Sequence, residues 1–119
     1  MNRIKTNNFI LIQDVVESDG ESTWSVKECN TGSMFYIHVF RNNQLNIKIF
    51  SHTRFISNPS EAIVALCNLL IDTTNIIPSI NIIYTNKNLI SICTKAGFKK
   101  KRNVKHLYIF KATHMKKRT

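Results

Sequence analysis

The stretch Leu45–Tyr84 decides the fold, and it reads LNIKIFSHTRFISNPSEAIVALCNLLIDTTNIIPSINIIY. Its two ends, Leu45–Phe50 and Ile80–Tyr84, are rich in β-branched residues and are expected to be strands. Between them, Pro59–Asp72 carries apolar residues at helical spacing, on a stripe wide enough to be buried against a sheet. A strand, a helix and a strand in this order predict a parallel crossover.

Capping residues support the positions of two helices. Asn58 is a candidate N-cap, Pro59 suits the first helical position, and Glu61 stands at the spacing of a capping box. A second helix is expected over Lys87–Lys95, closed by Gly97 in a left-handed conformation.

The residues before Leu45 predict an antiparallel meander. Expected strands are Phe9–Val16, Trp24–Cys29 and Met34–Phe40, with turn-forming residues between them, and a last strand is expected over His106–Lys111. Adjacent strand residues point to opposite faces, so Phe35 and Tyr36 cannot both face inward. The predicted fold is α+β, with a mixed, mostly antiparallel sheet of about six strands and two main helices.

Composition indicates one globular domain. The 119 residues are 43% hydrophobic and 20% charged, which fits residues 1–112 as a single domain followed by a basic tail over 113–119. No apolar run approaches the roughly 20 residues that cross a bilayer, and the first residues are polar. We therefore expect a cytoplasmic protein that does not bind membranes.

The cysteines and histidines do not suggest a metal site. Three cysteines, an odd number, are widely spaced and fit buried free thiols better than disulfides or a zinc site. No pair of histidines falls at a metal-ligand spacing. No metal is therefore expected. The residues are Cys29, Cys67, Cys93, His38, His52, His106 and His114.

Positive charge favours polyanionic partners. The formal net charge is +10, and much of it gathers in Lys99-Lys100-Lys101-Arg102 and in Lys116-Lys117-Arg118. Such charge attracts nucleic acid, acidic proteins and phosphorylated cofactors. No nucleic-acid-binding motif accompanies it, so the prediction of nucleic-acid binding rests on charge alone.

Residues 86–98, NKNLISICTKAGF, resemble the end of GNAT N-acetyltransferases, which has the approximate pattern N-x2-A-x3-Y-E-K-x-G-F. Asn86, Lys95, Gly97 and Phe98 match, whereas Cys93 stands where the family commonly has Tyr. The resemblance covers roughly residues 24–112. It implies an acyl-CoA N-acyltransferase fold, acetyl-CoA as cofactor and an amine as acceptor.

The same resemblance implies a pyrophosphate loop before the first helix, where backbone N–H groups face phosphate oxygens. The best match to the family's loop is residues 54–59, in which only Arg54 fits, Ser57 replaces a Gly and Pro59 lacks an N–H. The implied cofactor-binding residues are Arg54, Ser57, Asn58, Ser60, Asn86 and Lys95.

Acetyl transfer needs a base for the amine and an acid for the leaving thiolate. Cys93 is the candidate acid by its position in the family pattern, or else a small apolar residue on a buried helix face. Glu28 and His38 on central strands are the candidate bases, and the sequence does not choose between them.

Two functions stay open. The first is a GNAT-like acyl-CoA-binding protein with N-acetyltransferase activity. The second is a non-catalytic basic module on the same scaffold that binds nucleic acid or an acidic protein through Lys99, Lys100, Lys101 and Arg102. In either case an exposed strand edge would be covered by forming a homodimer.

Overall fold

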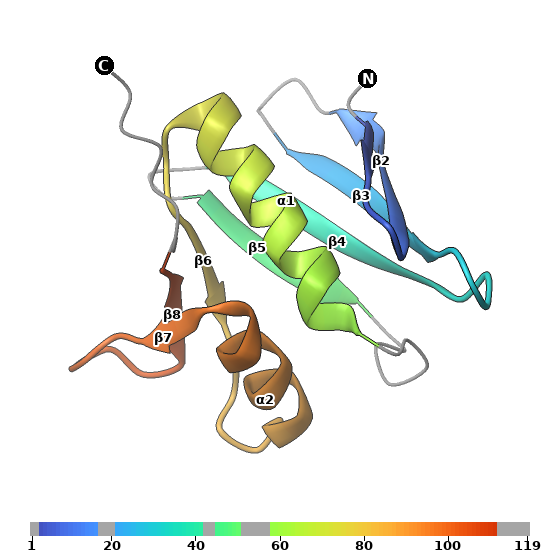
Figure 1. The fold of residues 1–119 in the computed structure, drawn as a ribbon. Coiled ribbons are helices and arrows are strands. Elements are labelled where there is room, and N and C mark those ends of the chain that lie inside the picture. Colours follow the sequence, from blue (N-terminus) through green and yellow to red (C-terminus); the bar gives the residue numbers. More distant parts are fainter. Residues whose placement is uncertain (1–2, 17–20, 42–44, 51–57, 112–119) are drawn as a thin grey trace.

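One sheet organises the part of the chain that the structure describes, which comprises residues 3–16, 21–41, 45–50 and 58–111 of this computed structural model (Figure 1). Its eight strands lie in the order β1-β2-β3-β4-β5-β6-β8-β7. The prediction of a mostly antiparallel α+β fold with two main helices is confirmed within these residues. The elements are β1 (Arg3–Lys5), β2 (Phe9–Val16), β3 (Ser22–Glu28), β4 (Met34–Arg41), β5 (Leu45–Phe50), α1 (Pro59–Thr74), β6 (Pro78–Asn81), α2 (Lys87–Ala96), β7 (Phe98–Lys100) and β8 (Leu107–Phe110).

The expectation of about six strands was too low, because both edge strands are short and polar. β1 forms because Ile4 pairs with Leu11 and lies half-buried between two exposed cations. β7 was not among the predicted strands. It forms because Phe98 is buried and contacts the ring of Phe110 edge-on, with ring centres 5.3 Å apart. One apolar side chain in three therefore holds each edge strand in place.

The predicted parallel crossover is confirmed. β5 and β6 are parallel, with Leu45 beside Pro78 and Ile47 beside Ile80. β6 begins two residues before the predicted strand Ile80–Tyr84 and ends at Asn81. The prediction was wrong at the far end because Ile83 and Tyr84 turn away into solvent, where 59% and 73% of their surface is exposed.

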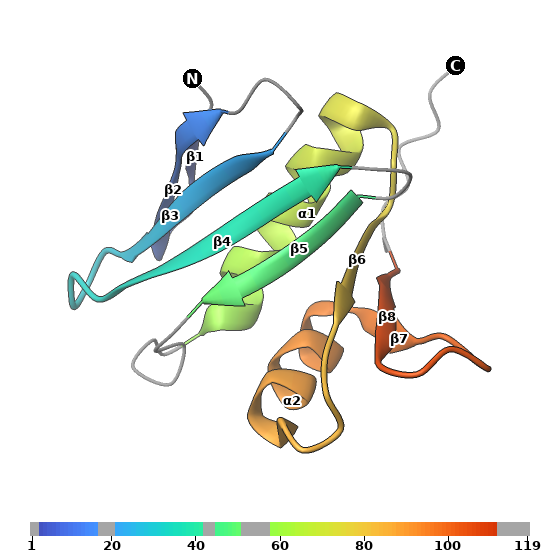
Figure 2. The same cartoon turned by 180° about the vertical axis from the view of Figure 1, so that it is seen from behind.

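Both described helices cover the same face of the sheet (Figures 1 and 2). The connections β5-α1-β6 and β6-α2-β7 each join strands that run in the same direction, and both step the same way across the sheet. Because such crossovers are almost always right-handed, both helices come to lie on one side. We call the side of the sheet that the helices cover the helix face. The core forms between this face and the helices, and it includes Phe9, Leu11, Trp24, Val26, Phe35, Ile37, Ile63, Leu66 and Ile80.

The opposite side of the sheet carries Tyr36, His38 and Phe40 of β4, and we call it the outer face. Phe35 is fully buried on the helix face, whereas Tyr36 is 41% exposed on the outer face. The expectation that these two residues point in opposite directions is confirmed. No helix of the described residues lies over the outer face (Figure 2).

The predicted caps define the helix ends. The side chain of Asn58 accepts a hydrogen bond from the Glu61 amide, and Pro59 is the first residue of α1. The side chain of Asn86 caps α2 in the same way through the Leu89 amide, and Gly97 ends α2 with φ of 112°. Only glycine adopts such a φ without strain.

The sheet ends at β1 and β7, and both strands carry exposed cations. These are Arg3 and Lys5 on one edge and Lys99 and Lys100 on the other. Charged edge strands oppose pairing with a second chain. The predicted homodimer remains a prediction that needs another surface or a neutralising partner.

Candidate functional site

β5 and β6 form a fork in the sheet. Their parallel pairing ends at Ile47 and Ile80, and the strands then diverge toward their C-terminal ends (Figure 2). The cause is the antiparallel neighbour of each strand. β5 stays paired with β4 as far as Phe50, and the Ile82 amide after β6 donates to the His106 carbonyl at 2.8 Å. Within the described residues, the β5 backbone beyond Ile47 is not paired with β6.

The closed end of the fork is polar. The Ser79 hydroxyl donates a 2.9 Å hydrogen bond to the Asn46 side-chain oxygen and lies 3.3 Å from the Leu45 carbonyl. Both polar side chains are buried. Because a buried polar group is costly without its partner, this pair fixes the register of β5 against β6.

The first turn of α1 lies after the end of β5. Pro59 has no N–H to offer, and the Glu61 amide is capped by Asn58 at 3.4 Å. Ser60 therefore carries the first-turn amide that Asn58 does not cap. Arg54 and Ser57, the other implied phosphate-binding residues, lie outside the described residues.

Glu61 ties the start of α1 to the turn between β1 and β2. Its carboxylate accepts hydrogen bonds from the Asn8 side-chain amide at 3.1 and 3.3 Å and from the Thr6 hydroxyl at 3.2 Å. A carboxylate in the first turn is favourable for the helix dipole. It also places a negative charge beside any anion that approaches this end of the helix.

Ser60 joins the two helices. Its hydroxyl donates a 2.8 Å hydrogen bond to the Ile92 carbonyl of α2, and Ser60 is buried. The hydroxyl is therefore committed to α2. The predicted ligand role of Ser60 can involve its amide only.

Asn86 and Lys95 lie at opposite ends of α2. Asn86 is its N-cap and Lys95 is in its last turn. Nine residues of helix separate them by about 13 Å at about 1.5 Å per residue. The backbone positions of Asn86 and Lys95 are therefore too far apart for one pyrophosphate to lie beside both.

Cys93 is fully buried in the core. Burial raises its pKa to about 12. Burial also raises the pKa of Cys67 well above its ordinary value, with a smaller contribution from the negative charge that Cys93 would carry when ionised. Both thiols stay protonated at neutral pH, and the location of Cys93 fits a small apolar residue. Cys29 is exposed, so the expectation of three buried thiols fails there.

The two candidate bases lie on opposite faces of the sheet. Glu28 pairs with Phe9, is 1% exposed on the helix face and accepts a 2.8 Å hydrogen bond from the Thr31 hydroxyl. The β3 strand that holds it is separated from β5 by β4.

His38 faces outward from β4. Its Nδ1 shares a 3.1 Å hydrogen bond with the Thr23 hydroxyl, and its Nε2 lies 3.7 Å from the Glu21 carboxylate. The structure therefore does not bring Glu28, His38 and Cys93 into one group.

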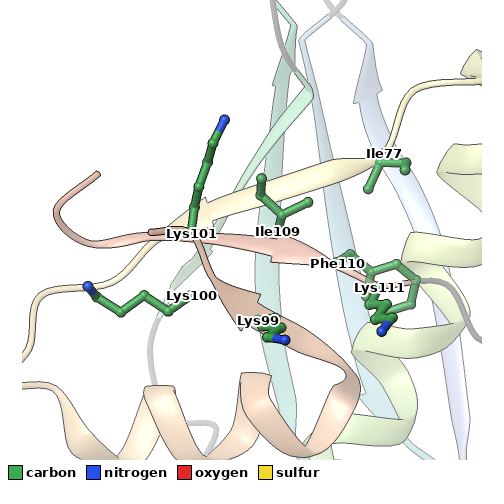
Figure 3. Close-up of a pocket in the computed structure, with 7 residues that line it drawn as sticks. All are labelled: Ile77, Lys99, Lys100, Lys101, Ile109, Phe110 and Lys111. Atoms are coloured by element: carbon green, nitrogen blue, oxygen red, sulfur yellow. The ribbon is translucent and has the colours of Figure 1, made fainter. Parts of the chain in front are cut away.

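A second site is a groove beside β7 and β8 with a volume of about 540 Å³ (Figure 3). We call it the lysine groove. Its apolar lining comes from Ile77, Ile109 and Phe110, and its charge comes from Lys99, Lys100, Lys101 and Lys111. Three of the four predicted basic residues line it, whereas Arg102 does not.

The sequence pattern gave Lys111 no functional role and gave Glu61 only a role in capping the helix. Lys111 follows Ile109 by two positions in the predicted last strand. Every second residue of a strand points to the same face, so this spacing could have assigned both residues to one face. Glu61 is joined to Asn8 across 53 residues, a contact that no local pattern reveals.

Among the residues that the structure describes, no histidines, cysteines, aspartates and glutamates gather in a group that could hold a metal ion. None of the helices in this part of the chain has the length and apolar character needed to span a bilayer.

Comparisons with models of protein families, with curated proteins and with solved structures found no match to this chain.

Proposed function

We propose that this chain is a GNAT-like acyl-CoA-binding protein, with acetyl transfer to an amine as its reaction class. The observation that supports the proposal is the fork, in which β5 and β6 separate after three paired residues each. An extended ligand with amide groups can hydrogen-bond to strand backbone that has no neighbouring strand. The pantetheine part of CoA has this character.

The start of α1 supports binding of the CoA pyrophosphate. A helix N-terminus carries partial positive charge and directs amides outward. The amide of Ser60 belongs to this turn, and the sequence supplies Arg54 four residues before Asn58. Asn58 and Asn86 support the site indirectly, because each of them caps the helix that it precedes.

Acetyl-CoA would bring an activated acyl group as a thioester, so the chain has to orient the thioester and the amine. We assign the orienting role to the backbone of β5 beyond Ile47. No acid or base is assigned, because Cys93 is buried, Glu28 lies two strands from β5 and His38 faces outward.

Isothermal titration with acetyl-CoA tests the proposal. We expect binding that weakens about tenfold or more in Arg54→Ala, because a hydrogen bond to a charged group is worth about 1.5–3 kcal/mol. Arg102→Ala removes the same charge from the turn after β7 and is the matched control. Absence of binding at millimolar acetyl-CoA, or equal losses in both variants, would refute the proposal.

The second function, a basic module without catalysis, is supported by a different observation. Four lysines surround the apolar floor of the lysine groove, and the phosphates of nucleic acid or the carboxylates of an acidic protein would neutralise them. Neutralising Lys99 and Lys101 together should abolish binding of a polyanion that wild-type protein binds in a salt-dependent manner. Unchanged binding would contradict it.

A further inference from the structure

The outer face of the sheet collects most of the positive charge of the described strands. Residues that pair directly across antiparallel strands lie on one face. Arg3 pairs with Ile12, which pairs with Ser25, which pairs with Tyr36. The same reasoning, applied strand by strand, places five of the seven strand cations on the outer face. They are Arg3 and Lys5 of β1, Lys27 of β3, Lys48 of β5 and Lys99 of β7.

Acidic residues are scarce on this face. Of the acids in the described strands, Glu28 is buried on the helix face and Asp14 lies on the outer side, where it accepts a 3.2 Å hydrogen bond from the Ser25 hydroxyl. Glu21, just before β3, adds a second carboxylate on this side, 3.7 Å from Nε2 of His38. Two carboxylates do not offset five cations, so the outer face attracts anions.

Aromatic side chains run along the central strand of the same face. Tyr36 is 41% exposed, and the rings of His38 and Phe40 lie next to each other with centres 5.6 Å apart. Lys48 is the direct partner of His38 on β5. Aromatic rings next to cations match the alternation of bases and phosphates in a single strand of nucleic acid.

The strand register connects these aromatic rings to the lysine groove. One row on this side of the sheet runs from Phe40 through the buried Asn46 and Ser79 to Ile109 and Lys99. The row crosses four strand intervals of about 4.8 Å, a distance of about 19 Å. Its last two residues line the lysine groove, where Lys101 points to the same side as Ile109 (Figure 3).

We propose that the outer face binds single-stranded nucleic acid, with bases stacked on Tyr36 and Phe40 and phosphates held by Lys27, Lys48 and the lysine groove. The inference rests on the second function above and names its ligand. Unpaired bases expose the flat surfaces that aromatic rings contact, whereas a duplex hides them.

Two other occupants fit the outer face less well. A second copy of this chain would bring two cationic faces together, which like-charge repulsion opposes. An acidic peptide would satisfy the lysines but would leave the aromatic side chains of β4 without a matching group. Charge together with exposed rings therefore favours nucleic acid.

Fluorescence anisotropy with labelled oligouridylate and oligodeoxythymidylate of about 12 nucleotides tests the proposal, because such lengths fall within known site sizes. We expect Tyr36→Ala to weaken binding about 5- to 150-fold, because stacking contributes about 1–3 kcal/mol per base. Tyr36→Phe should bind like wild type. Tyr84→Ala, which removes an exposed aromatic ring from the loop after β6, is the matched control and should have no effect.

The salt dependence separates the phosphate contacts from the stacking. Lys27→Gln and Lys48→Gln should each lower the slope of log K against log salt by about 0.7, the value for one phosphate on a single strand. Tyr36→Ala should leave the slope unchanged. Lys87→Gln on α2 is the control for charge and should change neither slope nor affinity.

Three results would overturn the inference. If Lys99→Gln and Lys101→Gln weaken binding while Tyr36→Ala, Lys27→Gln and Lys48→Gln do not, the lysine groove alone binds the polyanion, and the second function survives without the outer face. If polyglutamate binds with the same dependence on Tyr36, the ligand is an acidic protein. If sedimentation shows a dimer that dissociates in Tyr36→Ala, the outer face is an interface between copies.

Discussion

The Ser60 hydroxyl donates a 2.8 Å hydrogen bond to the backbone carbonyl of Ile92, and this bond joins the first turn of α1 to the body of α2. The two residues are 32 positions apart in the chain. The contact therefore links the β5-α1-β6 crossover to the β6-α2-β7 crossover at the N-terminal end of α1.

Ser60→Ala should lower the free energy of unfolding by about 1 kcal/mol, because a buried hydroxyl loses its bond. The loss of stability should lie at the low end of the range typical of one hydrogen bond if the Ile92 carbonyl keeps a second bond within α2. Urea denaturation measures it. Ser91→Ala, an exposed position on α2, should change stability by less than about 0.5 kcal/mol. Equal effects of the two substitutions would contradict a role for the Ser60 bond.

Stability should fall at alkaline pH because of the buried thiols. The pKa of Cys93 rises from the ordinary 9.0 to about 12 on folding. Above pH 9 the unfolded chain therefore releases a proton that the folded chain keeps. The contribution is complete below about pH 9 and is lost toward pH 12, at up to about 1.4 kcal/mol per pH unit.

Cys93→Ala removes that contribution, so the unfolding free energy of the variant should decline less steeply than that of wild type between about pH 9 and 11. Cys29→Ala removes an exposed thiol and should retain the wild-type slope. Denaturation curves over this pH range provide the comparison. Identical slopes in all three proteins would show that Cys93 ionises as easily folded as unfolded.

Gly97→Ala should be strongly destabilising. Its φ is 112°, and an added Cβ would lie 3.4 Å from the Lys111 carbonyl oxygen. Gly32 also has positive φ, of 74°, but an added Cβ there meets no atom within 4 Å. Both alanines carry a conformational cost of about 1–2 kcal/mol. The cost is higher at Gly97, because its φ of 112° lies farther than the 74° of Gly32 from the left-handed region at about +57° that other residues can adopt. Thermal melts should therefore rank Gly97→Ala below Gly32→Ala, and the reverse order would contradict this difference in backbone strain.

Glu61→Gln should have opposite effects on stability and on cofactor binding. The amide keeps the size of the side chain but loses the charge that favours the helix dipole and the bonds from Asn8, so stability should fall by about 1 kcal/mol. The same change removes a negative charge beside the proposed phosphate site. Titration with acetyl-CoA should therefore show tighter binding.

Asp72→Gln is the control for this effect, because Asp72 is exposed near the far end of α1. It should leave acetyl-CoA affinity unchanged. Weaker binding by Glu61→Gln would mean that the carboxylate helps the ligand instead of repelling it.

Local pattern was enough to predict most of the fold. Strand-forming residues between turn-forming residues identified β2 and β5 to the residue, and Asn58, Pro59 and Gly97 marked helix ends because caps depend on neighbouring residues only. β1 and β7 were not predicted, because three-residue strands have almost no periodicity. Each of them depends on one side chain, Ile4 or Phe98, whose burial is decided by distant partners.

The candidate sites were less predictable. The family resemblance selected residues on separate elements, and the structure gives Ser60 and Asn86 defined structural contacts while it separates Glu28 from His38. The lysine groove was anticipated in part, since Lys99, Lys100 and Lys101 are consecutive. Lys111 joins them through the pairing of β7 with β8, which sequence spacing alone does not show.

The short parallel ladder between β5 and β6 also affects the order in which the chain can fold. Strands β2 to β5 pair with their immediate neighbours, so the meander can assemble from nearby residues as synthesis proceeds. The contact between Asn46 and Ser79 spans 33 residues and must wait until α1 and β6 have left the ribosome. Until then β5 is an unpaired edge strand of the sheet. We expect the pairing of β5 with β6 to be the slow step in the folding of the domain.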